Sequence, residues 1–347
     1  MAHARDQVMG TAGRRGAELL LGIDIGGTKT AAGLVDLDGR LLHLGTPRPT
    51  PGARGPDAVL ATAVGVAREA IASRPAGTHV VRVGVGSAGV IDAATGRVLS
   101  ATDALTGWAG TPVQERLTAA LGVPVAVDND VHGHALGEWW QGAGAGLGPT
   151  GSLLFVAVGT GVGASLVVGG RVVHGAHSVA GHAGHVPSVR AGDRPCPCGG
   201  RGHVESVAAG PAMTAEYAAR TGHVVPGLAD VVARAEGGDV VAGAVLAEGA
   251  AALGDAVGAL LNVLDPDVVV LGGGVSSVGE TWWRPMRAAA VAQALEPVRS
   301  TPLVPARAGA ALLGAAWIAR QLEPAESQAG LPAPTSFGAP EHPEVAR

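Results

Sequence analysis

The hydrophobic pattern near the start of the chain predicts a strand, a glycine turn and a second strand. An apolar run ends on Asp24, a glycine pair follows at Gly26 and Gly27, and residues 31–35 form a second apolar run. Short apolar runs bounded by glycine are typical of a β-hairpin. Residues 153–174 repeat the order of apolar strand, glycine turn with threonine, apolar strand, Gly-Arg, two aliphatic residues and His. The repeat predicts two related halves, each with its own glycine hairpin.

The rest of the pattern predicts an α/β fold. Buried strands are predicted at residues 80–85, 123–127 and 267–271, and apolar residues recur at helical spacing between them. Strands that alternate with helices are typical of sheets covered by helices. Residues 84–89 match a dinucleotide-binding fingerprint by letter, but no helical pattern follows them, so we reject that motif. The predicted helices cover residues 56–73, 112–121, 131–141, 211–221, 228–235, 239–264, 282–295 and 308–322.

These elements predict two lobes flanked by tails. Residues 1–18 lack the apolar run of a secretory signal and are expected to form a flexible tail. We assign residues 19–133 to a small N-terminal lobe, joined by the C-terminal helix 308–322, and residues 134–307 to a large C-terminal lobe. Residues 323–347 are rich in proline and polar residues and are expected to be disordered.

Composition excludes several classes of protein. Of the 347 residues, 47% are hydrophobic and only 15% are charged, which indicates a globular chain. The formal net charge of −5 provides no basic surface for nucleic acid or for an anionic membrane. Glycines interrupt the uncharged stretch at residues 152–170, so no membrane span is expected. Two cysteines cannot form a disulfide framework, so we expect a cytoplasmic protein.

The glycine hairpins carry the residues expected to bind phosphate. Backbone N–H groups in a glycine turn can surround an anion, and a strand-end carboxylate can hold Mg²⁺ beside it. An ordinary hairpin with a glycine turn is the alternative for either copy taken alone. The glycines at residues 272–274, after a buried strand, suit close passage of a nucleotide. The expected ATP-binding and magnesium-binding residues are Asp24, Gly26, Gly27, Thr28, Lys29, Thr30, Gly159, Thr160, Gly161, Gly273 and Gly274.

Asp130 is the expected catalytic base. It follows the predicted strand at residues 123–127, together with Asp128 and Asn129. If the hairpins hold ATP, a carboxylate must orient the acceptor hydroxyl and take its proton. Asp128 and Asp130 alternate in an extended segment, so their side chains are predicted to point in opposite directions. A solvated Asp-Asn-Asp turn without a catalytic role is the alternative.

Four nitrogen and sulfur donors in the segment at residues 182–205 predict a structural zinc site. Two thiolates and two imidazoles suit tetrahedral Zn²⁺, and a closed site would hold together a loop with little core of its own. His182 competes for one ligand position, and surface thiols without metal are the alternative. The assigned ligands are His185, Cys196, Cys198 and His203.

Together these motifs resemble the ROK family of sugar kinases and repressors, within the actin-like ATPase superfamily. The resemblance implies a duplicated ribonuclease H-like fold of two lobes, each with a five-stranded mixed sheet, that close over ATP, Mg²⁺ and a hexose. It also implies a homodimer. Repressors of the family carry a helix-turn-helix ahead of the first hairpin, and only eighteen residues precede Leu19, so the kinase branch is favoured. The resemblance covers residues 19–322 and rests on DIGGTKT at 24–30, the DND segment followed by Gly137-Glu138, GTGVGAS at 159–165, the AGHAGH to HVE segment at 180–205, and LGGGV at 271–275.

The resemblance also implies roles for single residues. By position, Asp130 matches the family's base, and His182 stands where the family usually has a glutamate that receives sugar hydroxyls. Ala104 replaces the usual asparagine, and His203 replaces a third cysteine. The loss of two sugar-hydroxyl partners predicts an altered choice of acceptor. The expected substrate-binding residues are Gly89, Asp103, Asn129, His182, His185 and Glu205.

The leading hypothesis is a glucokinase-like enzyme that phosphorylates the 6-hydroxyl of a hexose or aminohexose with ATP. Kanosamine, 3-amino-3-deoxyglucose, is a candidate acceptor because Asp103 could pair with its ammonium group. The phosphoryl donor stays open between ATP, another triphosphate and polyphosphate. A catalytically weak sugar-sensing ROK protein is the second hypothesis, prompted by His182 and Ala104. A dinucleotide-dependent oxidoreductase rests only on the letter match described above.

Overall fold

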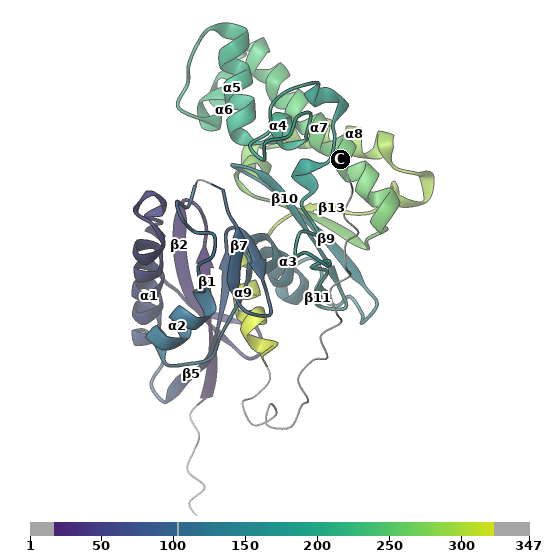
Figure 1. Cartoon of the computed structure of the whole chain (residues 1–347). Helices are drawn as coiled ribbons and strands as arrows, with labels where there is room; N and C mark the ends of the chain where they lie inside the picture. Colours follow the sequence, from purple (N-terminus) through teal and green to yellow (C-terminus); the bar gives the residue numbers. More distant parts are fainter. Residues whose placement is uncertain (1–16, 103, 323–347) are drawn as a thin grey trace, which may run out of the picture.

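Two separate sheets form the framework of the chain. The computed structural model describes residues 17–102 and 104–322, and Figure 1 shows one sheet in each half of the molecule, with α3 between them. The first sheet has the order β3-β2-β1-β5-β8, and β4 pairs with β2 as a sixth strand, one more than the five implied by the resemblance. Its strands are β1 (Ala17–Ile25), β2 (Lys29–Asp36), β3 (Leu41–Leu44), β4 (Arg48–Pro49), β5 (Thr78–Ser87) and β8 (Val125–Asn129).

The second sheet repeats part of this arrangement. Its order is β11-β10-β9-β12-β13, and β9 and β10 form an antiparallel hairpin as β1 and β2 do. The two predicted glycine hairpins are therefore confirmed as hairpins. The strands are β9 (Ser152–Val158), β10 (Val162–Val168), β11 (Arg171–Val172), β12 (Val268–Gly272) and β13 (Leu303–Pro305), and a separate two-stranded sheet is formed by β6 (Val90–Asp92) and β7 (Arg97–Ser100).

Helices cover both sheets and follow the predicted pattern closely. Residues 84–89 end β5 and lead into β6 rather than into a helix, so rejection of the dinucleotide motif is confirmed. The α-helices are α1 (Pro56–Ala72), α2 (Val113–Leu121), α3 (Asp130–Gln141), α4 (Glu205–Ala208), α5 (Gly210–Thr221), α6 (Leu228–Glu236), α7 (Val240–Leu264), α8 (Glu280–Gln293) and α9 (Ala310–Arg320). The 3₁₀ turns are η1 (Gly52–Arg54), η2 (Ala183–His185), η3 (Val189–Ala191), η4 (Gly274–Val278) and η5 (Glu296–Val298).

Two predicted boundaries need correction. β1 begins at Ala17, so the last two residues of the expected tail at residues 1–18 belong to the first sheet. The C-terminal helix covers Ala310–Arg320 rather than residues 308–322, because Gly309 has a left-handed backbone conformation with φ of 84° that starts the helix later. The remainder of the expected tails, at residues 1–16 and 323–347, lies outside the described residues.

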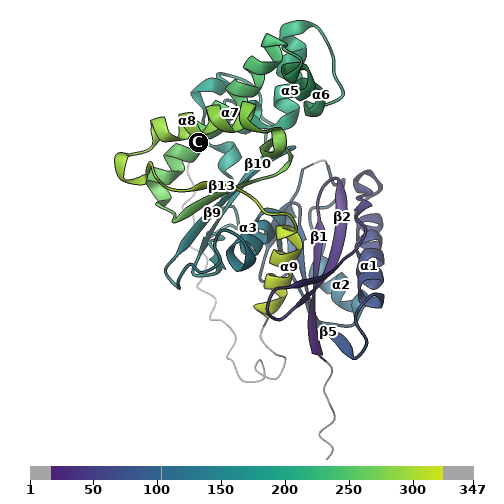
Figure 2. The same ribbon diagram turned by 180° about the vertical axis from the view of Figure 1, so that it is seen from behind.

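The first sheet is buried on both faces, as the continuous apolar run of β1 predicts. Leu19, Leu21 and Ile23 belong to a core that includes residues of α1, whereas Leu20 lies on the opposite face in a core with residues of α9. The second sheet packs its own core against α5, α7 and α8. Figure 2 shows α9, from the end of the described chain, beside the strands of the first sheet.

α9 approaches the first sheet and α3 backbone to backbone through glycines. A Cβ atom at Gly22 would overlap the carbonyl oxygen of Leu312, and a Cβ atom at Gly84 would overlap that of Ala315. A Cβ atom at Gly314 would likewise overlap a carbonyl oxygen of α3. Because overlap with backbone cannot be relieved by a rotamer change, these contacts require glycine.

α7 is long and apolar enough to cross a membrane, judged by length and composition alone. It is, however, a core helix of the second half, where it packs against α8, α6 and α5 and contributes Leu246, Leu253 and Val257 to the core. Buried core helices of globular proteins pass the same test.

Gly84→Ala is expected to destabilise the fold by about 1–3 kcal/mol or more, because overpacking forces the backbones of β5 and α9 apart. Gly243→Ala is the matched control: a Cβ atom at this position in α7 meets no atom within 4 Å. Because alanine has the higher helix propensity, the control is expected to stabilise the protein by up to about 1 kcal/mol. Urea unfolding followed by circular dichroism measures both changes. Equal stability of the two variants would contradict the proposed close contact.

Candidate functional site

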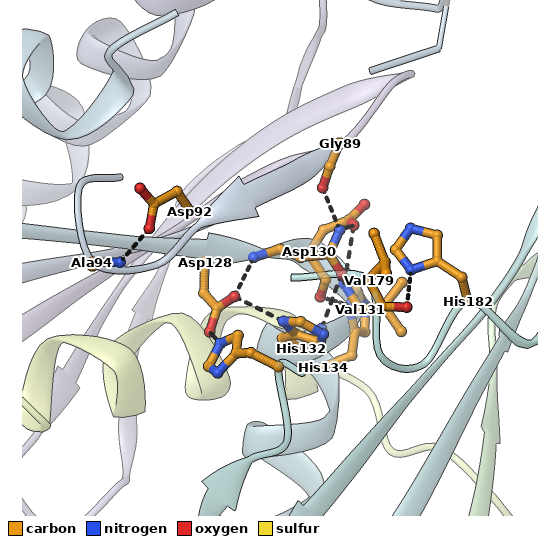
Figure 3. A network of polar contacts seen from close by, with 12 residues as sticks. Gly89, Asp92, Ala94, Asp128, Asp130, Val131, His132, His134, Val179 and His182 are labelled. Carbon is orange, nitrogen blue, oxygen red and sulfur yellow. Dashed lines mark hydrogen bonds and ion pairs between the residues drawn. The ribbon is translucent and has the colours of Figure 1, made fainter. Parts of the chain in front are cut away.

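The turn from β8 into α3 gathers polar groups at the carboxyl end of β8. Asn129 is the N-cap of α3, and its Oδ1 accepts hydrogen bonds from the backbone N–H groups of Val131 at 2.8 Å and His132 at 3.2 Å. Its Nδ2 donates to the carbonyl oxygen of Gly89 at 2.8 Å and to Asp130 Oδ1 at 3.0 Å (Figure 3). Both N–H donors of the amide are thus used within the protein. A sugar hydroxyl would reach Asn129 only by replacing one of these partners.

Asp130 presents one carboxylate oxygen that the described residues leave free. Its Oδ1 accepts from the backbone N–H of Val131 at 3.0 Å as well as from Asn129, whereas its Oδ2 has no hydrogen-bond partner among the described residues. Burial raises the pKa of Asp130 above the ordinary carboxyl value. A carboxylate with one oxygen fixed and one oxygen available can orient a hydroxyl group and accept its proton.

Asp24 lies at the end of β1 and is buried, with 9% of its surface exposed. Burial raises its pKa to about 6, and the nearby charge of Asp130 adds to the effect. The Asp24 carboxylate has no hydrogen-bond partner among the described residues. Because a buried carboxylate without a partner is costly to ionise, its chemistry fits a bound cation such as Mg²⁺.

The first glycine hairpin has free backbone donors at its tip. Gly26 N–H donates to the carbonyl oxygen of Lys29 at 3.0 Å, while the N–H groups of Gly27 and Thr28 have no acceptor among the described residues. Lys29 is exposed, but Thr30 has no exposed surface and its hydroxyl lies 2.8 Å from that of Thr50. The side chain of Thr30 therefore faces the interior in this conformation, and its contact with phosphate stays a prediction.

Sequence analysis missed the part played by Thr50. Its hydroxyl donates to the carbonyl oxygen of Gly26 at 2.8 Å, and its N–H donates to that of Thr28 at 2.9 Å. Thr50 thereby fixes the backbone at the tip of the first hairpin. It stands in a loop rich in proline and glycine, where no periodic pattern marks one residue above its neighbours.

The second glycine hairpin has the same donor arrangement and an added carboxylate. Gly159 N–H donates to the carbonyl oxygen of Gly161 at 2.9 Å, and the N–H groups of Thr160 and Gly161 are free of acceptors among the described residues. Glu205 Oε2 accepts from Val162 N–H at 2.7 Å. A Cβ atom at Gly161 would lie 2.7 Å from that oxygen, so glycine gives Glu205 room beside the hairpin.

A cavity of about 900 Å³ opens next to the second hairpin. Gly159 and Thr160 line one end, and Gly274 lines another part. Gly273 does not line it; its φ of 87° and its contact with the backbone of Val158 give it a structural role in the turn after β12. The remaining walls come from α5, α6, their connection and the rest of η4. They include Pro211, Thr214, Leu228 and Val232, which the sequence did not single out.

Two loops from the first half lie near the first hairpin and the β8 turn. Gly89 has φ of 106°, and its carbonyl oxygen receives the Asn129 amide. Ala104 is exposed and would lie 3.6 Å from a Cβ atom at Gly27. Asp103, the predicted partner of an ammonium group, lies outside the described residues.

The segment around η2 carries the two predicted sugar-site histidines. Gly181 and Gly184 allow this segment to lie directly on the backbone of β10, since a Cβ atom at either would overlap a carbonyl oxygen. His182 is exposed and its Nδ1 lies 2.9 Å from the carbonyl oxygen of Val179 (Figure 3). His182 and His185 stack with ring centroids 6.1 Å apart.

The predicted zinc ligands come together in space. Cys196 Sγ lies 3.7 Å from His185 Nδ1, and Cys198 Sγ lies 3.3 Å from His203 Nδ1. All four donor atoms are within 4.8 Å of one another, and His182 does not belong to the group. Tetrahedral Zn²⁺ with ordinary bond lengths separates sulfur and nitrogen ligands by roughly 3.6 Å, so the donor set fits this ion.

His134 is a further site residue that sequence analysis missed. Its Nδ1 lies 2.9 Å from the carbonyl oxygen of Asp130, one helical turn earlier, and its ring stacks on Phe155 at 5.6 Å between centroids. Its charge works against the burial that raises the pKa of Asp24 and of Asp130. Its position four residues after Asp130 on a predicted helix was the available signal.

Comparison with known proteins places this geometry in a family. A family model described as the ROK family matches residues 20–322. The chain belongs to the ROK family. This ROK protein is 31% identical to a glucokinase from Halalkalibacterium halodurans, over 87% of this chain and 95% of that protein.

A ROK family glucokinase from Streptomyces griseus, solved in complex with glucose and AMPPNP, matches with a TM-score of 0.73 and 32% identity, over 87% of this chain and 99% of that one. A putative xylose repressor from Caldicellulosiruptor is 30% identical over 64% of this chain and 57% of its own. The relatives of this ROK protein thus include both sugar kinases and a regulator.

Asp24→Asn is expected to stabilise the metal-free ROK protein at pH 7.5, because it removes a buried charge without a partner. A pKa of about 6 against the ordinary value of 3.8 corresponds to roughly 2–3 kcal/mol. The raised pKa means that the native state favours the protonated carboxyl, so the gain should shrink below pH 6 and vanish below the unfolded pKa. Unfolding by urea at pH 7.5 and at pH 3.5, both with chelator, measures this. A variant less stable than wild type at pH 7.5 would contradict the assignment of Asp24 as an unpaired carboxylate.

Proposed function

We propose that this ROK protein transfers the terminal phosphoryl group of ATP to the 6-hydroxyl of a hexose or aminohexose, with Asp130 as the general base. The observation that carries the proposal is the Oδ2 of Asp130 at the start of α3, near the buried Asp24. Neither this oxygen nor the Asp24 carboxylate has a hydrogen-bond partner among the described residues. The base orients the acceptor hydroxyl and takes its proton as the new P–O bond forms. The raised pKa makes the ionised Asp130 carboxylate a stronger proton acceptor than an ordinary carboxylate.

The phosphates would be held by backbone donors from both halves. In the first hairpin the donors would be the N–H groups of Gly27 and Thr28, and in the second those of Thr160 and Gly161. None of the four has an acceptor among the described residues. Asp24 would hold Mg²⁺, which when bound neutralises charge on the phosphate oxygens. The cavity that extends from Thr160 past Gly274 has a volume and an apolar lining that suit the base and ribose of a nucleotide.

The acceptor sugar would lie between the β8 turn and the segment around η2. Asp130, His182 and Glu205 are the groups we propose to contact its hydroxyls, with Gly89 allowing close approach. His182 is a donor and acceptor where an acidic residue would accept only, so we propose an acceptor other than unmodified glucose, with kanosamine among the candidates.

A structural Zn²⁺ bound by His185, Cys196, Cys198 and His203 would support this site. Glu205 Oε1 lies 4.0 Å from Cys196 Sγ while its Oε2 binds the second hairpin, so the metal segment and a phosphate hairpin share one carboxylate. His185 ends η2, within the segment proposed to contact the sugar, and it belongs to the donor set as well. Zinc would thus order residues on two sides of the acceptor.

A sugar-sensing protein without catalysis is the second candidate function, favoured by exposed His182 and by Ala104 in place of sugar-binding polar groups. Calorimetry of sugar binding together with an assay of ADP release separates the two functions. A sensor binds sugar but does not consume ATP in its presence.

Asp130→Asn is expected to lower kcat by about 100-fold or more, because amide replaces the proton acceptor. Release of ADP is measured over glucose, N-acetylmannosamine, N-acetylglucosamine, fructose, allose and kanosamine. Asp38→Asn, an exposed carboxylate in the β2–β3 turn, is the control and should retain full activity. No turnover by wild type with any of these sugars, or normal turnover by Asp130→Asn, would remove the proposal.

Cys196→Ser is expected to reduce bound zinc from about one ion per chain to a small fraction of that and to lower the melting temperature, because three ligands hold the ion far less tightly than four. Mass spectrometry of bound metal and thermal unfolding measure the two effects. His182→Gln is the matched control and should keep its zinc. Loss of zinc from His182→Gln instead would identify His182 as the ligand.

A further inference from the structure

Three side chains form a hydrogen-bonded group where the two halves of the chain meet. They belong neither to the glycine hairpins nor to residues 181–185 around η2, the sugar segment. Asp128 is the residue before the last in β8, His132 lies in the first turn of α3, and His174 follows β11 of the second sheet. His132 Nδ1 lies 2.8 Å from Asp128 Oδ1, and His174 Nε2 lies 2.8 Å from Asp128 Oδ2. The two imidazole rings meet edge to face at 5.0 Å between centroids. Figure 3 shows Asp128 turned toward His132, on the other side of the turn from Asp130.

Hydrogen bonds, rather than a bound metal ion, explain why these three side chains lie together. Each imidazole has its own carboxylate oxygen at hydrogen-bond distance, so donors and acceptors are matched without a further ligand. Burial opposes ionisation of Asp128, but the hydrogen bonds from His132 and His174 outweigh it and lower its pKa to about 2. The hydrogen bond to Asp128 in turn raises the pKa of His174. A hydrogen bond from a protonated imidazole to a carboxylate is stronger than one from a neutral imidazole, so protonation of His174 strengthens its contact with Asp128.

On one side, this group is connected to the turn that delivers the base. Asp128 Oδ1 accepts a hydrogen bond from the backbone N–H of Asn129 at 2.7 Å. Asn129 caps α3 and binds Asp130 Oδ1. A shift of the Asp128 carboxylate would therefore move the hydrogen-bond pattern that orients Asp130.

On the other side, the group is connected to the sugar segment. The carbonyl oxygen of His174 accepts from Ala180 N–H at 3.1 Å, which closes the loop before Gly181, His182 and His185. His174 belongs to the second half and Asp128 to the first. The pair therefore fixes the sugar segment relative to the β8 turn.

We infer that Asp128, His132 and His174 form a clamp across the two halves. In this clamp, His174 is a positioning residue that fixes the sugar segment relative to Asp130. The inference rests on the proposed kinase function for its kinetic effect, because the clamp touches neither substrate. The described ionisable groups that face the His174 ring are Asp128 from β8 and His132 from α3, and Arg171 of β11 itself is exposed. Loss of the proton from His174 weakens the clamp and leaves Asp130 less well directed.

The test compares His174→Leu, which removes the donor, with His174→Gln, which keeps an N–H group. His174→Leu is expected to lower kcat roughly 10- to 100-fold, the effect of misplacing a reacting group by about 1 Å, with KM for ATP unchanged. His174→Gln should recover part of kcat. His177→Gln, an exposed histidine three residues along the same loop, is the control and should match wild type.

The pH profile separates positioning from simple loss of stability. In wild type, kcat should fall as pH rises through the raised pKa of His174, because the charged donor is lost. His174→Gln should lack that fall while it stays folded, because its amide does not titrate. Unchanged kcat and pH profile in His174→Leu, or two tightly bound zinc ions per chain of which one is lost in His174→Leu, would overturn the clamp.

Nuclear magnetic resonance of the imidazole nitrogens gives a measure independent of activity. The His174 resonances should report a pKa above the ordinary histidine value, and Asp128→Asn should return it toward that value. A wild type without kinase activity but with this titration would remove the proposed function and keep the bonded clamp. An active wild type in which His174 has an ordinary pKa would keep the proposed function and overturn the clamp.

Discussion

The direct contact of backbone with backbone around α9 is the constraint on which the site depends. Gly22 and Gly84 allow α9 to lie on the first sheet, and Gly314 allows it to lie on α3. Because these contacts join backbone to backbone, no side-chain rotation can change the direction of α3 relative to the sheet. The other side of α3 contacts β9 and β10 of the second sheet. The residue that begins this helix is Asp130. Asp130, the residue we propose as the general base, is therefore carried on a helix that both halves of the described chain hold in place.

Three aspartates at one edge of the first sheet have three different environments, which suit three different roles; Asp24 and Asp128 are buried, and Asp130 is partly exposed. Burial raises the pKa of Asp24 and of Asp130, one without a partner and one with a single oxygen engaged. Two imidazoles lower the pKa of Asp128 instead. A carboxylate left with unused acceptor capacity can serve a metal or a proton, whereas a carboxylate whose oxygens are both bonded can only hold its neighbours.

The two hairpins, the helices and the Cys/His group could be read from the sequence because each depends on local order: apolar runs, glycine turns and ligand spacing. Asp130 followed from the strand before it. The buried side chain of Thr30 was not foreseen, because residue type alone does not reveal which face of a strand a hydroxyl occupies. Thr50 was missed because its partners are distant in sequence. Asn129 matches the family position, yet its amide serves the helix cap and Gly89. The clamp joins residues 46 positions apart and was beyond any local pattern.

The position of α9 also has a consequence for how the protein is made. β1 is among the earliest described elements to leave the ribosome, but the helix that covers one of its faces comes from the far end of the described chain. During synthesis that apolar face, with Leu20, has no native cover until the second half has been translated. Contacts between such distant segments slow folding and leave nascent sheets open to aggregation. Molecular chaperones that bind exposed strands are therefore expected to engage this protein during translation, at the first sheet.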